Sequence, residues 1–250
     1  MSSYRNFSII TITFNNPDEL IFTGRSIIDF LQSGSNWIII NGGDSLVDVL
    51  EKSGLNEGNI SLFEESDKGI YDALNKGLGL IQSDYFMFLH SGDTFMSGAY
   101  DSIQGILNNM KSEDLLISLN NCVIGPRSFT SNYWKPFMLY YGCQPPHLPT
   151  IYASKYFKEL KYKSNYKIIS DFILFYKIFS DGIIEKHQIS KDNFFLVNMK
   201  TGGLTTGLFS GRLTIFSELI KEFGLFRALF MTLMKYPFKL IFQSFPNYPS

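Results

Sequence analysis

Phe7-Ser-Ile-Ile-Thr-Ile-Thr-Phe14 is the first of four short apolar stretches in the N-terminal part of this chain. The other three are Trp37–Ile40, Ile60–Phe63 and Tyr85–Leu89. Each stretch is rich in β-branched or aromatic residues and is bounded by polar or glycine-containing segments, which is typical of a buried strand. Because successive residues on both faces are apolar, we expect these strands to be covered on both sides.

Segments with helical spacing separate these strands. They are Asp18–Leu31, Asp44–Lys52 and Ile70–Ile81, and the last carries an apolar stripe along one face. The alternation of strand and helix predicts an α/β fold with a mainly parallel central sheet, flanked by helices and joined by right-handed crossovers.

Beyond about residue 112 the alternation is less regular. There we expect two helices, Ser154–Leu160 and Asp171–Phe179. The further strands that we expect are Leu115–Leu119, Cys122–Ile124, Ile183–Ile189 and Phe194–Met199.

The composition excludes several classes of protein. Of the 250 residues, 45% are apolar and only 18% are charged, so the chain is not a disordered one. Lys and Arg (22) nearly balance Asp and Glu (23), which argues against a nucleic-acid partner. The two cysteines, Cys122 and Cys143, are too few for a disulfide framework or a thiolate metal cluster. No signal-like start and no long uncharged apolar stretch occurs, which predicts a cytosolic protein without a spanning helix.

The segment Leu208–Phe245 has a basic amphipathic pattern, in which Phe and Leu recur at helical spacing and cations outnumber carboxylates. One interpretation is a helix pair that covers the core. The other is an interfacial helix whose apolar side chains enter a membrane surface while Lys and Arg meet anionic headgroups. Pro237 and the interspersed charges exclude a spanning helix.

Short polar loops follow all four N-terminal strands. They are Asn15–Asp18, Asn41–Ser45, Glu64–Gly69 and His90–Asp93. In an open α/β sheet, ligands bind at the carboxyl ends of the strands, so these loops are the predicted site. Gly42 lets the backbone approach a ligand closely, although an ordinary turn explains it equally well.

Two features of these loops indicate chemistry. Asp72, Asn75 and Lys76 share one face of the helix predicted from about residue 70, which can face a cleft or solvent. Asp67, just before it, suits either a ligand contact or a helix N-cap. Asp93, after a fully apolar strand, is either a turn residue or an oxygen ligand for Mg²⁺ or Mn²⁺.

Four motifs, taken together and in order, resemble those of glycosyltransferase family 2, in particular bacterial transferases that build O-antigen, capsule or colanic-acid repeats. The motifs are Ile9–Asn16, Ile40–Gly43, Glu64–Gly77 and Tyr85–Asp93. The resemblance implies a GT-A fold, a nucleotide-diphosphate sugar donor, with a UDP-sugar favoured, and inversion at the anomeric carbon.

The same resemblance assigns roles to individual residues. Thr11, Asn15 and the Asn41-Gly42 turn match positions that hold the base and ribose, although the family usually has aspartate where Asn41 stands. The positions that match the donor-closing motif are Asp67, Tyr71, Asp72 and Asn75.

Asp93 matches the metal-binding aspartate of a D-X-D-type motif, in which Ser91 stands at the first position and is counted with the donor contacts. The resemblance therefore implies Mn²⁺ or Mg²⁺, held through one carboxylate and the donor diphosphate.

Three features of the second half complete the prediction. Asp171 matches the late acidic motif and is our candidate for the catalytic base, with a helix N-cap as the alternative. His147 matches a histidine that precedes the acceptor region, and it suits either an acceptor or phosphate contact or a structural role. Lys200–Gly207 suits a lid, a diphosphate contact or an ordinary flexible loop.

We therefore expect a GT-A catalytic domain over residues 1–207, with a nucleotide-sugar half (1–112) and an acceptor half (113–207), followed by an amphipathic segment over 208–250. The expected acceptor is a lipid-linked saccharide or an oligosaccharide at the inner face of the cell membrane. Two alternatives are another nucleotide-sugar enzyme, such as a nucleotidyltransferase, and a non-catalytic donor-binding subunit of a synthase complex. The first loop has no basic phosphate-activating signature, which argues against the nucleotidyltransferase.

Overall fold

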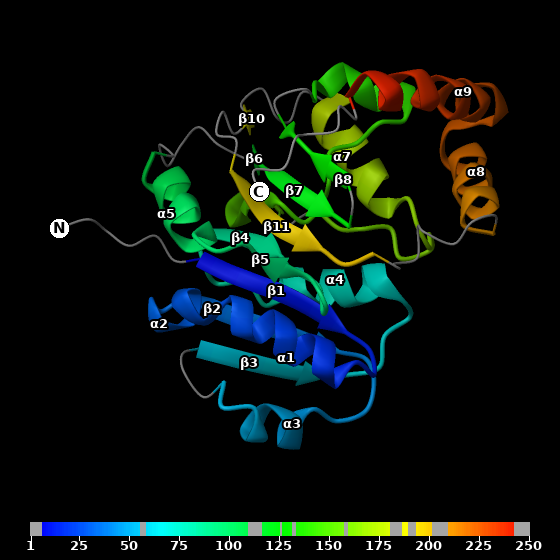
Figure 1. Ribbon diagram of the computed structural model, residues 1–250. Helices are drawn as coiled ribbons and strands as arrows, with labels where there is room; N and C mark the ends of the chain where they lie inside the picture. The colour runs from blue at the N-terminus through cyan, green and yellow to red at the C-terminus, as the bar shows by residue number, and fades with distance from the viewer. Residues whose placement is uncertain are drawn as a thin grey trace.

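The computed structural model describes residues 7–55, 59–109, 117–125, 127–131, 134–157, 160–180, 187–189, 194–201 and 210–242. Among these residues the main sheet has seven strands in the order β10-β6-β9-β4-β1-β2-β3 (Figure 1). Its parallel part consists of β1 (Phe7–Thr13), β2 (Asn36–Asn41), β3 (Asn59–Glu64) and β4 (Tyr85–Phe88). These four strands correspond to the four predicted apolar stretches.

Helices connect the parallel strands, as the strand and helix alternation predicts. They are α1 (Pro17–Ser26), α2 (Ile28–Gln32), α3 (Val47–Lys52) and α4 (Ile70–Gly79), and a further helix, α5 (Ala99–Asn109), comes after β4 in the chain. Helix α4 packs closely on the sheet, since a Cβ on Gly77 would lie 2.6 Å from Cγ2 of Ile10 in β1. The predicted α/β class with a flanked central sheet is confirmed.

The structure differs from the sequence prediction at several elements. The single helix expected over Asp18–Leu31 is divided at Ile27, whose backbone (φ −110°, ψ 10°) leaves the helical region. Helix α5 was not predicted. Strand β9 (Thr150–Ala153) was also missed; it is short, pairs antiparallel with β4 and β6, and runs directly into α6 (Ser154–Phe157).

A smaller sheet of four strands, in the order β5-β11-β7-β8, lies beside the main one in the described part of the chain. Its members are β5 (Thr94–Phe95), β7 (Asn121–Ile124), β8 (Arg127–Phe129) and β11 (Phe195–Met199). The other late strands are β6 (Ile117–Leu119) and β10 (His187–Ile189), which cover only the described ends of the predicted 115–119 and 183–189. The small sheet joins the end of β11 to the loop that carries Asp93.

The second half contributes a 3₁₀ helix, η2 (Pro136–Tyr141), and the helices α7 (Ser170–Ser180), α8 (Ser210–Phe223) and α9 (Leu225–Phe242). Figure 1 shows α8 and α9 together at one end of the molecule. Leu219, Ala228 and Met231 are buried in the same core as α4 and α7, so one face of the helix pair packs on the core. Other apolar side chains stay exposed, among them Phe226 (88%) and Leu233 (70%). None of the helices in the described ranges is both long and apolar enough to cross a membrane.

Candidate active site

The strand order reverses direction at β1, because β2 lies on one side of it and β4 on the other. Such a switch point opens a crevice at the carboxyl ends of the strands, which is the usual ligand site of this type of sheet. The loop after β1 carries Asn15, and the loop after β4 carries Ser91 and Asp93. The predicted location of the site therefore coincides with the switch point.

The loops after β1, β2 and β3 are tied to one another by side chains. Asn15, in the left-handed region (φ 52°), accepts a hydrogen bond from the Asp44 amide at 2.8 Å. The Asn41 side chain is fully buried and donates to the Asp44 carbonyl (2.7 Å) and to a Glu64 carboxylate oxygen (3.1 Å), while it accepts from the Gly43 amide. These hydrogen bonds give Asn41 a role in the structure of this loop that does not depend on a ligand.

Glu64 was not singled out from the sequence. Its carboxylate accepts hydrogen bonds from the Leu46 amide (2.6 Å) and the Ser45 hydroxyl (2.9 Å) as well as from Asn41. The Leu46 amide is the main cause of a lowered Glu64 pKa. An anion that is bound by three donors holds the β2 and β3 loops together.

Gly42 and Asp67 are in close proximity, although they lie on different loops. A Cβ on Gly42 would lie 2.1 Å from Oδ2 of Asp67, so only glycine leaves room for this carboxylate. The other Asp67 oxygen accepts from the Gly69 amide at 2.9 Å, directly before α4. Asp67 thus stabilises the turn into α4, and its second oxygen lies against the Gly42 backbone.

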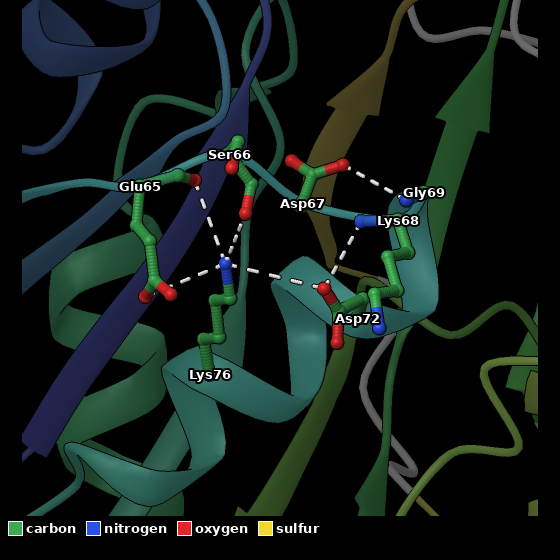
Figure 2. A network of polar contacts seen from close by, with 7 residues as sticks. All are labelled: Glu65, Ser66, Asp67, Lys68, Gly69, Asp72 and Lys76. Atoms are coloured by element: carbon green, nitrogen blue, oxygen red, sulfur yellow. Dashed lines mark hydrogen bonds and ion pairs between the residues drawn. The ribbon is translucent and has the colours of Figure 1, made fainter.

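Lys76 holds the segment before α4 in place (Figure 2). Its ammonium donates to the Ser66 carbonyl at 2.7 Å and lies 3.5 Å from a carboxylate oxygen of Glu65. Asp72 lies 4.0 Å from the same ammonium and accepts from the Lys68 amide at 3.0 Å. The predicted polar face of α4 therefore binds the chain that precedes it, and it positions the 65–69 segment.

Three residues that the resemblance assigned to donor binding make contacts inside the protein. Thr11 is fully buried, with its hydroxyl between Trp37 Nε1 (2.8 Å) and the Leu89 carbonyl (2.7 Å). Asn75 exchanges two hydrogen bonds with the backbone of Tyr162, at 2.9 and 2.8 Å. For Thr11 and Asn75 this geometry gives no support to a donor contact. The Thr11 hydroxyl joins β1 to β2 and to the end of β4, and the Asn75 side chain joins α4 to the second half of the chain.

Tyr71 is the third of these residues, and it faces the second half of the chain. It is 5% exposed, and its hydroxyl donates to the Ile168 carbonyl and to Asp171 Oδ1 (3.0 Å). Burial, together with the nearby Asp171 charge, raises the Tyr71 pKa, so the hydroxyl stays protonated and can donate. Helix α4 is thereby connected directly to Asp171.

Asp171 lies in the first turn of α7 with both carboxylate oxygens bound. Oδ1 accepts from Tyr71 and from the Phe172 amide (2.9 Å), and Oδ2 accepts from Gln144 Nε2 at 2.7 Å. Burial raises the pKa of Asp171, and the hydrogen bonds, that of Gln144 first, oppose this shift. A desolvated carboxylate of raised pKa, held in orientation by three donors, has the properties of a general base. The sequence did not indicate Gln144.

Asp93 is a buried carboxylate in the loop after β4, the strand that neighbours β1 on the side opposite to β2. It is 6% exposed, and Oδ1 accepts from the Lys200 amide at 2.7 Å. Burial raises its pKa to about 7, so its negative charge is poorly compensated by the protein alone. No group of three or more His, Cys, Asp or Glu side chains that could hold a metal occurs in the described residues. One hard oxygen ligand suits Mg²⁺ or Mn²⁺ only when substrate phosphates supply further ligands.

His90, three residues before Asp93, stacks on His147, and both rings lie near Phe88. Their ring centroids are 6.3 Å apart, and His147 also stacks on Phe88 at 4.7 Å and hydrogen-bonds the Tyr162 hydroxyl. Burial lowers the pKa of each histidine to about 3, so both rings are neutral. These contacts give His147 a structural role, and its predicted contact with acceptor or phosphate stays a prediction.

A series of side-chain contacts runs from the Asp171 carboxylate to the loop that carries Asp93. Each member hydrogen-bonds or stacks on the next, in the order Asp171, Tyr71, Tyr162, His147 and His90, and the His90 carbonyl accepts from the backbone amide of Asp93. Ser91, in the same loop as Asp93, is half-buried, and its hydroxyl lies 3.5 Å from the Asn16 carbonyl. Of the predicted Lys200–Gly207 loop, residues 202–207 lie outside the described residues.

Comparison with known proteins gives the following matches. Residues 8–188 match the profile of the family described as Glycosyl transferase family 2. Two curated relatives from Mycobacterium tuberculosis, the uncharacterized glycosyltransferases MT1564 and Rv1514c, are 38% identical over 96 residues, which is 38% of this chain. The chain spans only 37% of the length of each of these relatives.

Solved structures resemble the fold at low sequence identity. S. aureus TarS 1-349 in complex with UDP-GlcNAc has a TM-score of 0.67 and 11% identity, covering 94% of this chain and 73% of that one. The mannosyltransferase PcManGT from Pyrobaculum calidifontis, in complex with GDP-Man and Mn²⁺, has a TM-score of 0.64 and 12% identity, covering 96% and 74%. Both share the GT-A type of architecture with this chain.

Proposed function

Because the chain belongs to glycosyltransferase family 2, we propose that it is an inverting glycosyltransferase that moves a sugar from a nucleotide-diphosphate donor to an acceptor hydroxyl. The observation that carries this proposal is the hydrogen bond between Tyr71 and Asp171. It joins the helix of the donor motif to the candidate base, so both halves of the reaction are served by one assembled structure. In this proposal residues 1–112 bind the donor, 113–207 the acceptor, and 208–250 form the amphipathic segment.

The proposed transfer is a single displacement. Asp171 accepts the proton of the attacking hydroxyl, and the raised pKa that burial gives its carboxylate increases its basicity. Tyr71 and Gln144 each bind one of its two oxygens, so the carboxylate is held in a fixed orientation. The donor is proposed to lie against Asn15, the Asn41-Gly42 turn, Asp67, Asp72 and Ser91, with a UDP-sugar favoured.

Asp93 is proposed to hold Mn²⁺ or Mg²⁺ together with the donor diphosphate, because it is a buried carboxylate with an uncompensated charge. When bound, the cation would neutralise charge on the departing diphosphate. Support for metal and donor comes from two proteins of similar fold, whose structures contain UDP-GlcNAc in one case and GDP-Man with Mn²⁺ in the other.

The acceptor is proposed to be a polyprenyl-diphosphate-linked saccharide of surface-polysaccharide synthesis, of the O-antigen, capsule or colanic-acid type. The exposed apolar face of α9 supports this, since it combines Phe226 and Leu233 with Phe230 and Leu229. A surface of this kind, in a segment whose cations outnumber its carboxylates, suits the anionic inner face of the cell membrane.

A transfer assay tests the proposal. The protein is incubated with UDP- and GDP-sugars, Mn²⁺ and a polyprenyl-diphosphate-linked sugar, and the elongated lipid is detected by mass spectrometry. We expect transfer with inversion, and a decrease of at least about tenfold for Asp93→Asn. Asp48→Asn, the same change at an exposed site on α3, is the control. Donor binding without transfer to any acceptor would instead indicate a non-catalytic donor-binding subunit.

Liposome flotation tests the membrane contact separately. The double substitution Phe226→Ser with Leu233→Ser should reduce binding to anionic vesicles, because it removes exposed apolar area without touching the packed face. Phe22→Ser, at another exposed phenylalanine (58%) on α1, is the control. Equal flotation of all three proteins would refute the membrane contact.

A further inference from the structure

Helix α8 places a buried carboxylate against the segment that leads into α7. Glu218 is 8% exposed, and its Oε1 accepts from the Lys167 amide at 2.6 Å. Its Oε2 accepts from the Ile168 and Ile169 amides, both at 3.1 Å. Ile169 is at the N-cap position of α7, where an amide has no partner within the helix, and Lys167 and Ile168 directly precede it, so this carboxylate anchors the entry to α7 from a helix that is distant in sequence.

The three amides belong to the segment that fixes Asp171. The Ile168 carbonyl accepts the hydroxyl hydrogen bond of Tyr71, and the Ile169 carbonyl accepts from the Ile173 amide in the first turn of α7. Asp171 follows two residues after Ile169. A shift of residues 167–169 would therefore move the carboxylate and its Tyr71 contact together.

We infer that Glu218 is a positioning residue for Asp171, which makes α8 a part of the catalytic structure. This inference rests on the proposed function and extends it to the C-terminal segment. Glu218 touches neither the donor loops nor the Asp171 carboxylate, so it acts only through the backbone of residues 167–169.

Glu218→Gln is the test, because glutamine has one acceptor oxygen and turns an NH₂ group toward amide donors. Glu222→Gln is the matched control: it lies one turn later on α8 and binds Lys163 Nζ and the Tyr166 hydroxyl, but none of the three amides. For Glu218→Gln we expect kcat to decrease roughly tenfold or more, with the donor KM and the binding of UDP or GDP unchanged. For the control we expect kcat within about twofold of wild type.

Hydrogen exchange supplies a readout that does not depend on activity. In Glu218→Gln the amides of residues 167–173 should exchange at least about tenfold faster, while those of α4 remain protected. If wild-type protein transfers no sugar but this exchange pattern appears, the proposed function fails and the positioning contact stands. Unchanged exchange, or an equal loss of kcat in Glu222→Gln, overturns the inference. If Glu218→Gln does not fold, Glu218→Asp, which keeps both acceptor oxygens on a shorter stem, repeats the test.

Discussion

The loops after β1, β2 and β3, which we call the donor-edge loops, and the surroundings of Asp171 are assembled in different ways. Among the loops, Asn41 and Asp67 bind amides two positions away, and the longer contacts, from Asn41 to Glu64 (23 positions) and from Asp44 to Asn15 (29 positions), join loops of neighbouring strands. The partners of Asp171 lie 100 and 27 positions away, in Tyr71 and Gln144. The loops can therefore take their shape once neighbouring strands pair, whereas the geometry of Asp171 requires almost the whole chain to be folded.

This difference predicts the largest effect for Asp171→Asn. Loss of the base should lower kcat by about 10²–10⁴-fold, with donor binding unchanged, because the donor loops form independently. The measurement is initial rate against donor concentration, alongside calorimetric titration with the nucleotide. A parallel loss of donor affinity would contradict the separation of the two regions.

The same variant should be more stable than wild type at neutral pH. Burial raises the Asp171 pKa above its unfolded value, so wild-type stability is lost as the pH rises through the folded pKa. Asparagine does not ionise, and the unpartnered Oε1 of Gln144 can turn to accept from its amide. The melting-temperature difference should therefore disappear below about pH 4, near the unfolded pKa of an aspartate.

Tyr71→Phe removes the hydroxyl that binds both Asp171 and the Ile168 carbonyl, and so connects the two regions. The hydroxyl lowers the Asp171 pKa against the effect of burial, so its loss should move the acid limb of the kcat/KM profile to higher pH. We expect kcat at neutral pH to decrease roughly tenfold, equivalent to about 1.4 kcal/mol for one hydrogen bond to a charged group. An unshifted acid limb would show that Asp171 does not titrate in the reaction.

The same difference explains how much of the molecule the sequence could predict. The four apolar stretches and their loops were found because strand period and turn residues are local signals. The predicted base, Asp171, came from a motif, but its partners Gln144 and Glu218 leave no local pattern. Asn75 was assigned to the donor, yet it binds Tyr162, 87 positions away, which helical spacing cannot show.

Gly42→Ala tests the donor edge with a smaller expected effect. The new Cβ would lie 2.1 Å from Oδ2 of Asp67, so the carboxylate must rotate away from the loop. We expect donor affinity to fall about tenfold because one charged contact is lost, and kcat at saturating donor to stay nearly unchanged. Gly79→Ala is the control, since its Cβ meets nothing within 4 Å on α4, and it should raise the melting temperature slightly. Equal donor affinity in both variants would remove Asp67 from the donor site.

Lys76→Met should have the smallest effect, because it removes only partly exposed contacts. The side chain is 23% exposed, its ammonium binds the Ser66 carbonyl and Glu65, and methionine keeps most of the apolar stem (Figure 2). The free energy of unfolding should decrease by about 0.5–1 kcal/mol, and the donor KM should rise about two- to threefold as residues 65–69 loosen. Lys52→Met, at an exposed lysine on α3, is the control for loss of charge. If Lys76→Met changes kcat but not the donor KM, the 65–69 segment acts on Asp171 through α4 and Tyr71, and the two regions are coupled more tightly than their hydrogen bonds indicate.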